Sequence, residues 1–408
     1  MKITQITATL VYANWRNFTF IQIFTDEGLV GLGEATIRSR EHAVAGAVDD
    51  MARVLVGQDP FQIQAHWQSL YQDFHKRGGV ILMAAISGIE IALWDILGQA
   101  LGAPIYQLLG GKLRERVRVY NNGWFEGLRT LDELCRAAQQ AVEGGFTALK
   151  WNPFHGADGW LSPVQRRHTI AEVEAIRQAV GEEVDLMLEA HGLFTPAAAI
   201  ELANELAVFR PFWLEEPVPP EDERAMAYVR QRSPIPIAAG ERLYGKYEFA
   251  RLIEARAVDF VQPDITYAGG VFETRFIAMM AEARYLGFAP HNSGSPVSTA
   301  AALHLAACTP NFVILELPTN DVPWRNELVD PLIETPQQGM LDILEGAGLG
   351  VRLNMSVAQR HPYQNPDRAY LSQVVTPEME RLQKRLKHVP PEGDTGDGLG
   401  SERKTATG

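Results

Sequence analysis

The chain contains few cysteines, because only Cys135 and Cys308 occur among its 408 residues. Both lie in segments with a helical pattern, so we expect packing residues and neither a disulfide framework nor a thiolate metal site. Uninterrupted apolar runs are also short, and none approaches the roughly 20 residues that a membrane helix needs. The N-terminal stretch MKITQITATLVYA carries Thr and Gln within an alternating strand pattern, which is not typical of a secretory signal, so a cytoplasmic protein is expected.

Positive charge is scarce as well. The formal net charge of −13 argues against binding to nucleic acid or to an anionic membrane, because both require a basic face. An acidic small molecule is still compatible with this charge, since a metal ion or a lysine can reverse its sign locally. The apolar share of 46% and the charged share of 21% are ordinary for a globular protein.

The order of strand and helix patterns predicts two structural parts. Residues 2–37 have the pattern of strand, turn and strand, with hairpin chemistry at residues 26–28. Residues 82–103 have the apolar spacing of a packed helix. These elements predict a first domain of α+β type that spans residues 1–114.

From residue 115 onward, eight short strand-like runs alternate with helical stretches. The runs are VRVYNN, TALKWN, DLMLEAH, FWLEEP, IPIAAGE, FVQPD, GFAPHN and FVILE. This alternation predicts parallel βαβ units and an α/β fold of the barrel type over residues 115–330. Residues 331–388 are expected to return to the first domain, and residues 389–408, rich in Pro, Gly and charge, are expected to form a disordered tail.

Most of these runs finish on a polar or charged residue, and the C-terminal strand ends of such a barrel form its reaction site. Glu189 and Glu215 are 26 residues apart, and Glu241 follows 26 residues later, which is one βα unit each time. Three carboxylates brought together in this way repel one another unless a hard cation such as Mg²⁺ binds them. The spacing therefore predicts a Mg²⁺ site, although a single glutamate at such an end can also cap a helix or pair with Lys or Arg. Glu216 points to the other side of its strand and is expected behind the ligands or in a salt bridge.

Six motifs also resemble a known family. They are LEAH, WLEEP, AAGERL, VQPDITYAGG, APHN and ALWDILGQALGAPIYQLLGGK, the last at residues 92–112. Together they are similar to the enolase superfamily, in its mandelate racemase subgroup, over nearly the whole chain up to about residue 388. The resemblance implies a modified TIM barrel, (β/α)7β, with an α+β capping domain, and a symmetric homo-oligomer. It also implies a Mg²⁺ ion that stabilises the enediolate made by removing the proton α to a carboxylate.

The resemblance further implies residue roles. Glu189, Glu215 and Glu241 match the metal ligands, and Glu189 is a departure because many relatives have aspartate there. His291 and Asp264 match a His-Asp dyad in which the carboxylate orients the imidazole and raises its basicity.

The end of the second barrel strand bears on the type of reaction. Racemases of this subgroup carry a Lys-x-Lys pair there, where this chain has Lys150-Trp151-Asn152. Asn152 cannot take a proton at neutral pH, so racemisation with two bases lacks its second base. Lys150 is then expected to act as a cation for the substrate carboxylate and the enediolate oxygen. Glu316 matches the acidic residue that hydrogen-bonds a substrate carboxylate oxygen.

His191, two residues after Glu189, places a second imidazole at the same rim, because side chains two apart on a strand point the same way. Expulsion of a β-hydroxyl from an enediolate needs a proton, which His191 can supply. The pattern is similar to acid sugar dehydratases that act on galactonate or gluconate. It implies loss of water from a sugar acid to give a 2-keto-3-deoxy acid, with His291 as the base and His191 as the acid.

Substrate contacts are expected from Asn152 and from loops over the rim. The segments 14-NWRN-17 and 73-DFHKRGG-79 combine aromatic and basic groups with glycines, which suits polyol hydroxyls and a mobile lid. The candidates are Trp15, Arg16, His75 and Lys76, with His155 and Trp160 from an insertion at residues 153–163. Two alternatives stay open, namely an epimerase or cycloisomerase on the same enediolate platform, and a barrel that binds sugar acids without turning them over.

Overall fold

The structure is a computed structural model that describes residues 1–72, 76–128, 130–319 and 321–365. These residues belong to one compact unit. His75 and the predicted tail at residues 389–408 lie outside the described residues.

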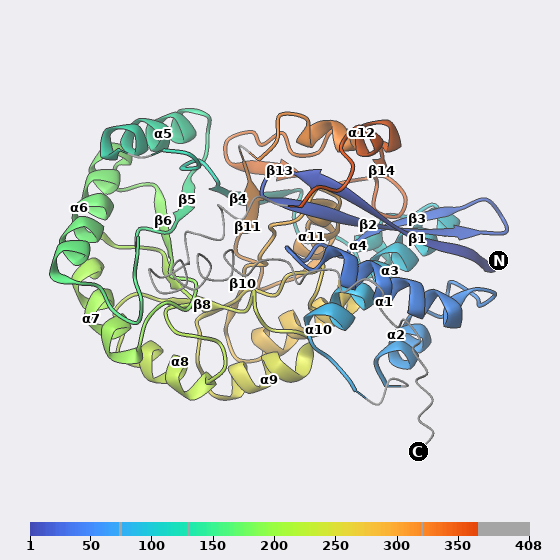
Figure 1. Ribbon diagram of the computed structural model, residues 1–408, viewed down its shortest axis with the longest axis horizontal. Helices are drawn as coiled ribbons and strands as arrows, with labels where there is room; N and C mark the ends of the chain where they lie inside the picture. Colours follow the sequence, from blue (N-terminus) through green and yellow to red (C-terminus); the bar gives the residue numbers. More distant parts are fainter. Residues whose placement is uncertain (73–75, 129, 320, 366–408) are drawn as a thin grey trace, which may run out of the picture. The chain divides into compact units, whose positions relative to one another are not determined.

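The N-terminal elements form a three-stranded antiparallel sheet with helices packed against it (Figure 1). The strands are β1 (Ile3–Ala13), β2 (Arg16–Thr25) and β3 (Val30–Glu34), and the helices are α1 (Glu41–Leu55), α2 (Ile63–Gln72) and α3 (Val80–Leu101). The turn between β1 and β2 contains Asn14 at φ 61°, a left-handed conformation that asparagine tolerates. The hairpin turn predicted at residues 26–28 joins β2 to β3 and is confirmed, with Gly28 at φ 85°.

Helix α3 packs closely on β3 because this strand carries glycine where the helix backbone approaches. A Cβ on Gly31 would lie 2.2 Å from the carbonyl oxygen of Ala92, and one on Gly33 would lie 2.0 Å from that of Gly88. The helix has 22 residues, and its most apolar 18-residue window has a mean hydropathy of 2.0, so it is long and apolar enough to cross a membrane. However, 72% of its most apolar window is buried within the protein, as in a core helix.

The larger part of the structure is a nine-stranded sheet in the order β10-β9-β8-β7-β6-β5-β4-β11, with β13 paired to β4. The parallel strands are β4 (Arg116–Asn122), β5 (Ala148–Trp151), β6 (Asp185–Glu189), β7 (Trp213–Glu215), β8 (Ile237–Ala239), β9 (Phe260–Val261), β10 (Gly287–Phe288) and β11 (Leu315–Pro318). Each predicted run overlaps one of these strands, and the strands are parallel to one another, so the predicted parallel arrangement is confirmed.

Helices connect successive strands on the outside of this curled sheet (Figure 1). They are α5 (Leu131–Glu143), α6 (Pro163–Val180), α7 (Pro196–Leu206), α8 (Glu223–Arg230), α9 (Lys246–Glu254), α10 (Gly270–Glu282) and α11 (Pro296–Cys308). Cys135 lies in α5 and Cys308 ends α11, and both are free thiols, as expected. The order of strands and helices is that of a (β/α)7β barrel.

The two edges of the sheet meet at Phe288 in β10. Phe288 forms a parallel bridge with Phe312, and its carbonyl accepts a hydrogen bond of 2.9 Å from the backbone N–H of Val313. The chain then continues into β11. A buried apolar cluster fills the interior of the sheet, and its members are Tyr120, Ala148, Met187, Trp213, Ala238, Ala289 and Ile314.

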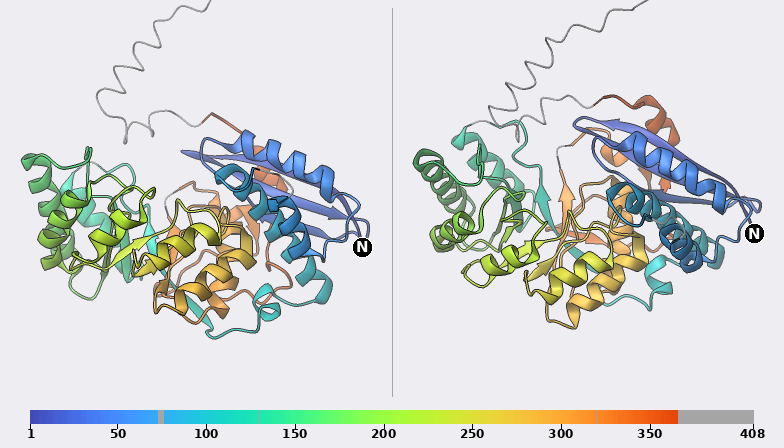
Figure 2. Two further views of the ribbon diagram at one scale, coloured as in Figure 1. Left: turned by 90° about the horizontal axis from the view of Figure 1, so that it is seen from below. Right: turned by 60° about the horizontal axis from the view of Figure 1, so that its bottom comes forward.

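The N-terminal elements lie beside the later barrel elements, α10 and α11, and away from α5 to α7 (Figure 2). Two buried carboxylates attach them there by capping barrel helices. Glu34 at the end of β3 accepts hydrogen bonds of 2.9 Å from the backbone N–H groups of Ser295 and Ser298, at the start of α11. Glu90 in α3 accepts one of 2.6 Å from the backbone N–H of Val271, in the first turn of α10. Carboxylates at helix N-termini are favourable because they satisfy N–H groups that have no partner within the helix.

The segment after β11 contacts both parts. Its short elements are η2 (Arg325–Leu328), β12 (Val329–Asp330), β13 (Met340–Asp342), β14 (Arg352–Leu353) and α12 (Met355–Arg360). Two further short helices, α4 (Ile105–Leu108) and η1 (Ala207–Phe209), lie earlier in the described chain. Strand β13 pairs with the barrel strand β4, whereas the backbone N–H of Leu349 donates to Asp95 in α3 at 2.8 Å. The division of the chain at residues 114, 330 and 388 stays a prediction.

Candidate active site

Strands β6, β7 and β8 bring the predicted metal ligands to one place. Met187 and Trp213 point into the apolar interior, and Glu189 and Glu215 follow two residues later on the same strands, so they share this inward direction. Glu241 follows the end of β8 by two residues. Each residue offers one carboxylate oxygen, and the three oxygens lie within 4.8 Å of one another. We call Glu189, Glu215 and Glu241 the carboxylate triad.

The carboxylate triad fits a divalent cation. Burial, together with the nearby Glu215 and Glu241, raises the pKa of Glu189 well above its ordinary value. The Glu189 Oε2 atom is buried and has no hydrogen-bond partner among the described residues. A cation bound here would satisfy this oxygen and remove the mutual repulsion, and a set of carboxylate oxygens is the donor type that Mg²⁺ prefers.

Lys150 in β5 provides positive charge next to the carboxylate triad. Its Nζ lies 2.8 Å from Glu215 Oε1, 3.3 Å from Glu316 Oε1 and 3.7 Å from Glu189 Oε2. Burial lowers the pKa of Lys150, but Glu215 and Glu316 outweigh it, so the pKa lies well above its ordinary value. Lys150 is therefore a fixed cation and not a free base.

His291 and Asp264 form the predicted dyad. The Nδ1 atom of His291 lies 2.7 Å from Asp264 Oδ2. The other oxygen of Asp264 accepts hydrogen bonds from the backbone N–H of Thr266 at 2.8 Å and from its hydroxyl at 2.6 Å. These bonds fix the carboxylate, so that it orients the imidazole and leaves Nε2 directed elsewhere.

The Nε2 atom of His291 faces other site residues, at 3.2 Å from Glu241 Oε2 and 3.8 Å from Glu316 Oε2. Burial lowers the pKa of His291, but Glu241, Glu316 and Asp264 raise it to about 10. A cation that neutralises Glu241 removes the largest of these raising effects. The arrangement thus links the proton affinity of the imidazole to the charge on the carboxylate triad.

Glu316 in β11 is held on both oxygens. Oε1 lies next to Lys150 and accepts a hydrogen bond from Asn122 Nδ2, while Oε2 accepts one of 3.0 Å from the backbone N–H of Asn292. Burial raises the pKa of Glu316, but Lys150, His291 and these donors lower it to about 2. Glu316 is therefore ionised and accepts hydrogen bonds.

His191 follows β6 in a left-handed conformation at φ 48°, where its backbone N–H donates to Glu189 Oε1 at 2.6 Å. Its imidazole is exposed at the strand ends, and Nδ1 lies 3.1 Å from Asn152 Nδ2. Although part of the ring surface is open, desolvation by the surrounding protein is the main cause that lowers the pKa of His191. The lowered pKa makes the protonated ring a stronger acid, and it also leaves less of the ring protonated at neutral pH.

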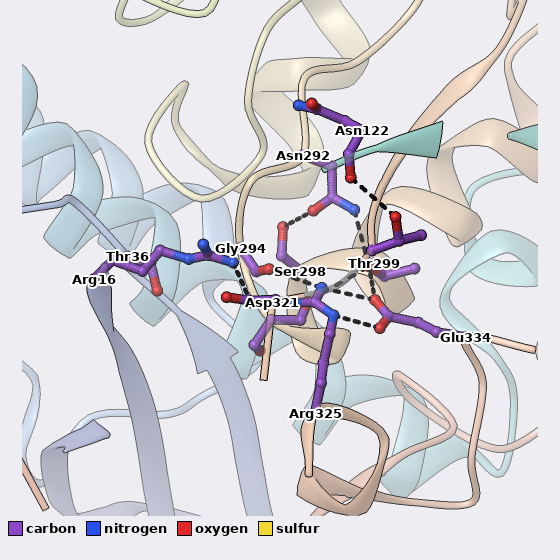
Figure 3. Close-up of polar contacts among 12 residues, drawn as sticks. Arg16, Thr36, Asn122, Asn292, Gly294, Ser298, Thr299, Asp321, Arg325 and Glu334 are labelled. Atoms are coloured by element: carbon purple, nitrogen blue, oxygen red, sulfur yellow. Dashed lines mark hydrogen bonds and ion pairs between the residues drawn. The ribbon is translucent and has the colours of Figure 1, made fainter. Parts of the chain in front are cut away.

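The predicted substrate contacts do not all gather at the strand ends. Arg16 is 1% exposed, and its Nη2 forms an ion pair of 2.7 Å with Asp321, as Figure 3 shows. Its guanidinium carbon also lies 3.9 Å from the centre of the Trp15 ring. Lys76 is exposed. Direct substrate contact by Trp15, Arg16, His75, Lys76 or Asn152 stays a prediction.

The insertion at residues 153–163 lies beside the loop that carries His191. The backbone N–H of Gly159 donates to the carbonyl of Leu193, and that of Thr195 donates to Gly159, both at 2.9 Å. The indole of Trp160 is 65% exposed, whereas His155 Nε2 lies 3.4 Å from a carboxylate oxygen of Glu172. The insertion thus extends the rim next to His191. Its His155 is engaged by Glu172.

Several site residues were not predicted from the sequence. The hydroxyl of Tyr267 lies 3.1 Å from His291 Nδ1, and Asn122 and Asn292 hold Glu316. Tyr267 and Asn292 stand within the motifs VQPDITYAGG and APHN, which was the available signal. Glu216 was expected behind the ligands or in a salt bridge, and its ion pair with Arg242 confirms this.

Comparison with known proteins identifies the family. The family model described as Enolase C-terminal domain-like matches residues 133–357, and the model of the mandelate racemase / muconate lactonizing enzyme N-terminal domain matches residues 5–110. The chain belongs to the enolase superfamily, in its mandelate racemase subgroup. The resemblance found in the motifs is confirmed, and the N-terminal sheet and helices are its capping domain.

Individual members of the superfamily are similar over most of their length. The D-galactonate dehydratase of Verminephrobacter eiseniae (strain EF01-2) is 37% identical over 372 residues, which cover 90% of this chain and 96% of the relative. The D-gluconate dehydratase of Thermoproteus tenax is 36% identical over 353 residues, which cover 86% of this chain and 71% of the relative. The crystal structure of a mandelate racemase/muconate lactonizing enzyme from Sulfitobacter sp. matches with a TM-score of 0.84 and 33% identity, covering 89% of this chain and 96% of that one. Enolase superfamily members bind a divalent metal, which agrees with the carboxylate triad.

Proposed function

We propose that this chain is a Mg²⁺-dependent dehydratase of a sugar acid, an aldonate such as galactonate or gluconate, and that it forms the 2-keto-3-deoxy acid. The observation that supports this proposal most strongly is the arrangement of acidic and basic side chains around the carboxylate triad. The dyad of His291 and Asp264 and a second imidazole, His191, border the same carboxylate triad, while Asn152 occupies the place of a second base. The dehydratases among the relatives support this proposal.

The first step removes the proton α to the substrate carboxylate. His291 takes this proton on Nε2, while Asp264 holds Nδ1 and stabilises the imidazolium that forms. The electron pair left on the α-carbon forms an enediolate. Bound Mg²⁺ supplies positive charge that stabilises the enediolate oxygens. Lys150 adds a second fixed positive charge in the same space.

The second step expels the β-hydroxyl. The electron pair of the enediolate forms a double bond to the β-carbon as the bond from that carbon to oxygen breaks. His191 gives a proton to the departing oxygen, so that it leaves as water. The enol then takes up a proton on the β-carbon and loses the proton of its hydroxyl group, which gives the 2-keto-3-deoxy acid.

The alternatives fit the residues less well. An epimerase needs a second base to return the proton from the opposite face, and Asn152 cannot serve as one. A barrel that only binds sugar acids would have no use for a buried His-Asp dyad beside a metal site.

From the resemblance to the enolase superfamily, we also propose that the working form is a symmetric homo-oligomer in the cytoplasm.

The proposal is tested by incubating the protein with Mg²⁺ and a panel of aldonic and aldaric acids and measuring 2-keto-3-deoxy product. At least one aldonate should give product, and the His291→Asn variant should give none. His304→Gln is the matched control, because His304 is a buried histidine outside the site and its replacement should leave turnover intact. Absence of product from every acid, in protein with demonstrably bound metal, would contradict the proposal.

A further inference from the structure

A buried chain of charges connects the capping domain to the loop that carries the proposed base. Asp321, five residues after Glu316, has a side chain that is 2% exposed. Its Oδ2 accepts hydrogen bonds from Arg16 Nη2 at 2.7 Å and from Arg325 Nη1 at 3.0 Å. Figure 3 shows this carboxylate between the two arginines, one from the capping domain and one from η2.

Arg325 continues the connection on its other side. Its Nε donates to Glu334 at 2.6 Å, and its Nη2 donates both to Glu334 and to the carbonyl oxygen of Gly294, each at 2.9 Å. Gly294 lies three residues after His291, on the same loop. The planar guanidinium can hold three acceptors in fixed directions, which an ammonium group cannot do.

Glu334 then leads to the site itself. It accepts a hydrogen bond of 2.6 Å from the Thr299 hydroxyl, which accepts one of 2.9 Å from Asn292 Nδ2. The backbone N–H of Asn292 donates to Glu316 Oε2. A continuous set of hydrogen bonds therefore runs from Arg16 to a carboxylate that faces His291.

The capping end of the chain positions an aromatic side chain. Arg16 stacks on the ring of Trp15, in the turn between β1 and β2. This turn is the part of the capping domain from which substrate contacts are expected. A carboxylate that fixes Arg16 therefore also fixes where Trp15 lies.

We propose that Asp321 and Arg325 are positioning residues, which hold the Trp15 turn of the capping domain in a fixed relation to the loop after β10. The kinetic meaning of this inference depends on the proposed dehydratase function. The contact between Arg16 and Asp321 governs substrate affinity, because it fixes the Trp15 turn of the capping domain. The contact between Arg325 and Glu334 governs the placement of His291 and Glu316, and therefore the rate of the chemical step. Neither Asp321 nor Arg325 is expected to touch the reacting atoms.

The test compares three conservative variants by steady-state kinetics on the Mg²⁺-loaded full-length protein, with rates expressed per folded active site. Asp321→Asn and Arg16→Lys should raise KM roughly tenfold and change kcat about twofold or less, because they loosen binding common to ground and transition states. Arg325→Lys should lower kcat roughly tenfold or more, with a smaller change in KM. Arg177→Lys is the control, because Arg177 is also buried and its guanidinium donates hydrogen bonds to four backbone carbonyls outside the site.

Hydrogen exchange measured by mass spectrometry provides a readout that does not require turnover. In the Mg²⁺-loaded protein without substrate, Asp321→Asn should speed amide exchange both in residues 14–17 and in residues 291–298. Arg177→Lys should leave both segments unchanged. If both segments respond but no sugar acid is converted by the wild type, the connection stands and the proposed function fails. If Asp321→Asn changes neither segment, or if the variants only lower stability while KM and kcat match those of the wild type, the inference is overturned.

Discussion

The Nζ atom of Lys150 lies 2.8 Å from Glu215 Oε1, inside a barrel end that carries four further acidic side chains, Glu189, Glu241, Asp264 and Glu316. Both members of this pair are buried, with side-chain exposures of 3% and 0%. In the absence of a metal ion, Lys150 and the imidazolium of His291 are the positive charges that offset these carboxylates. The stability of the protein and its proposed catalysis therefore depend on the same buried charges.

Replacing Lys150 with methionine should therefore destabilise the metal-free protein strongly. Removing one partner of a buried ion pair leaves the other charge uncompensated, which costs roughly 3–5 kcal/mol. Mg²⁺ should recover part of this loss, so the rise in Tm on adding Mg²⁺ should be larger in the variant than in the wild type. Lys112→Met is the control, because Lys112 pairs with the exposed Glu115 and Glu345 and its loss should change Tm little. Equal destabilisation by both variants would contradict this reading.

Glu189→Gln should affect the metal-free and metal-bound proteins in opposite directions. The amide removes one negative charge from the carboxylate triad, so the free energy of unfolding without metal should stay equal or increase. The affinity for Mg²⁺ should fall by roughly a hundredfold or more, since the variant loses a charged oxygen ligand. Calorimetric titration with Mg²⁺ and urea unfolding in chelator test the two halves. Unchanged Mg²⁺ affinity would remove Glu189 from the ligand set.

His304 should make the protein sensitive to acid. The backbone N–H of Tyr106 donates to its Nδ1 at 3.4 Å and Nε2 lies 3.1 Å from the carbonyl oxygen of Leu349, so the ring is held neutral. Burial lowers the pKa of His304 from its ordinary value near 6.5 to about 4. Between these values the unfolded chain binds a proton that the folded chain does not. The free energy of unfolding should therefore fall as the pH drops from about 6.5 to about 4, by roughly 1.4 kcal/mol per pH unit.

The His304→Gln variant isolates this effect. Urea unfolding in chelator at several pH values between 7 and 4 should show a weaker loss of stability in the variant than in the wild type. The two curves should run parallel below about pH 4, where the folded ring also becomes protonated. Parallel curves over the whole range would mean that His304 does not cause the acid sensitivity.

Glu34 should be a main attachment point of the capping domain. It accepts hydrogen bonds from the backbone N–H groups of Ser295 and Ser298, and from the hydroxyl of Thr36 at 2.6 Å. Glu34→Ala leaves these buried donors without an acceptor, which should cost roughly 3 kcal/mol. Glu34→Gln keeps one accepting oxygen and should cost less. Urea unfolding of both variants checks this order, and a glutamine variant as unstable as the alanine one would contradict it.

The parts of the site that were predicted from the sequence are those that follow from strand periodicity. Glu189 and Glu215 end neighbouring strands, and Glu241 follows the next strand by two residues. The constant βα spacing brings one carboxylate oxygen of each within 4.8 Å of the others. The dyad followed from the same regularity together with the family motifs. The local sequence was enough here because a parallel barrel turns equal spacing along the chain into adjacency in space.

Other contacts depend on how distant segments meet, and the sequence carries no regular signal for them. The ion pair between Arg16 and Asp321 joins residues 305 positions apart. The contact between Asn152 and His191 depends on the backbone conformation after each strand ends. His191 has a left-handed backbone conformation there. For this reason Asn152 and His191 were each predicted as site residues, but the contact between them was not predicted.

The fate of the α-proton in the His191→Asn variant distinguishes the role of His291 as the base from that of His191 as the acid. The Mg²⁺-loaded variant is incubated in D₂O with an aldonate that the wild type converts, and α-deuterium and keto acid are both measured. We expect the variant to exchange the α-proton through His291 still, while dehydration falls by roughly a hundredfold or more. Dehydration at the wild-type rate, or loss of exchange together with dehydration, would contradict the assignment of His291 as the base and His191 as the acid.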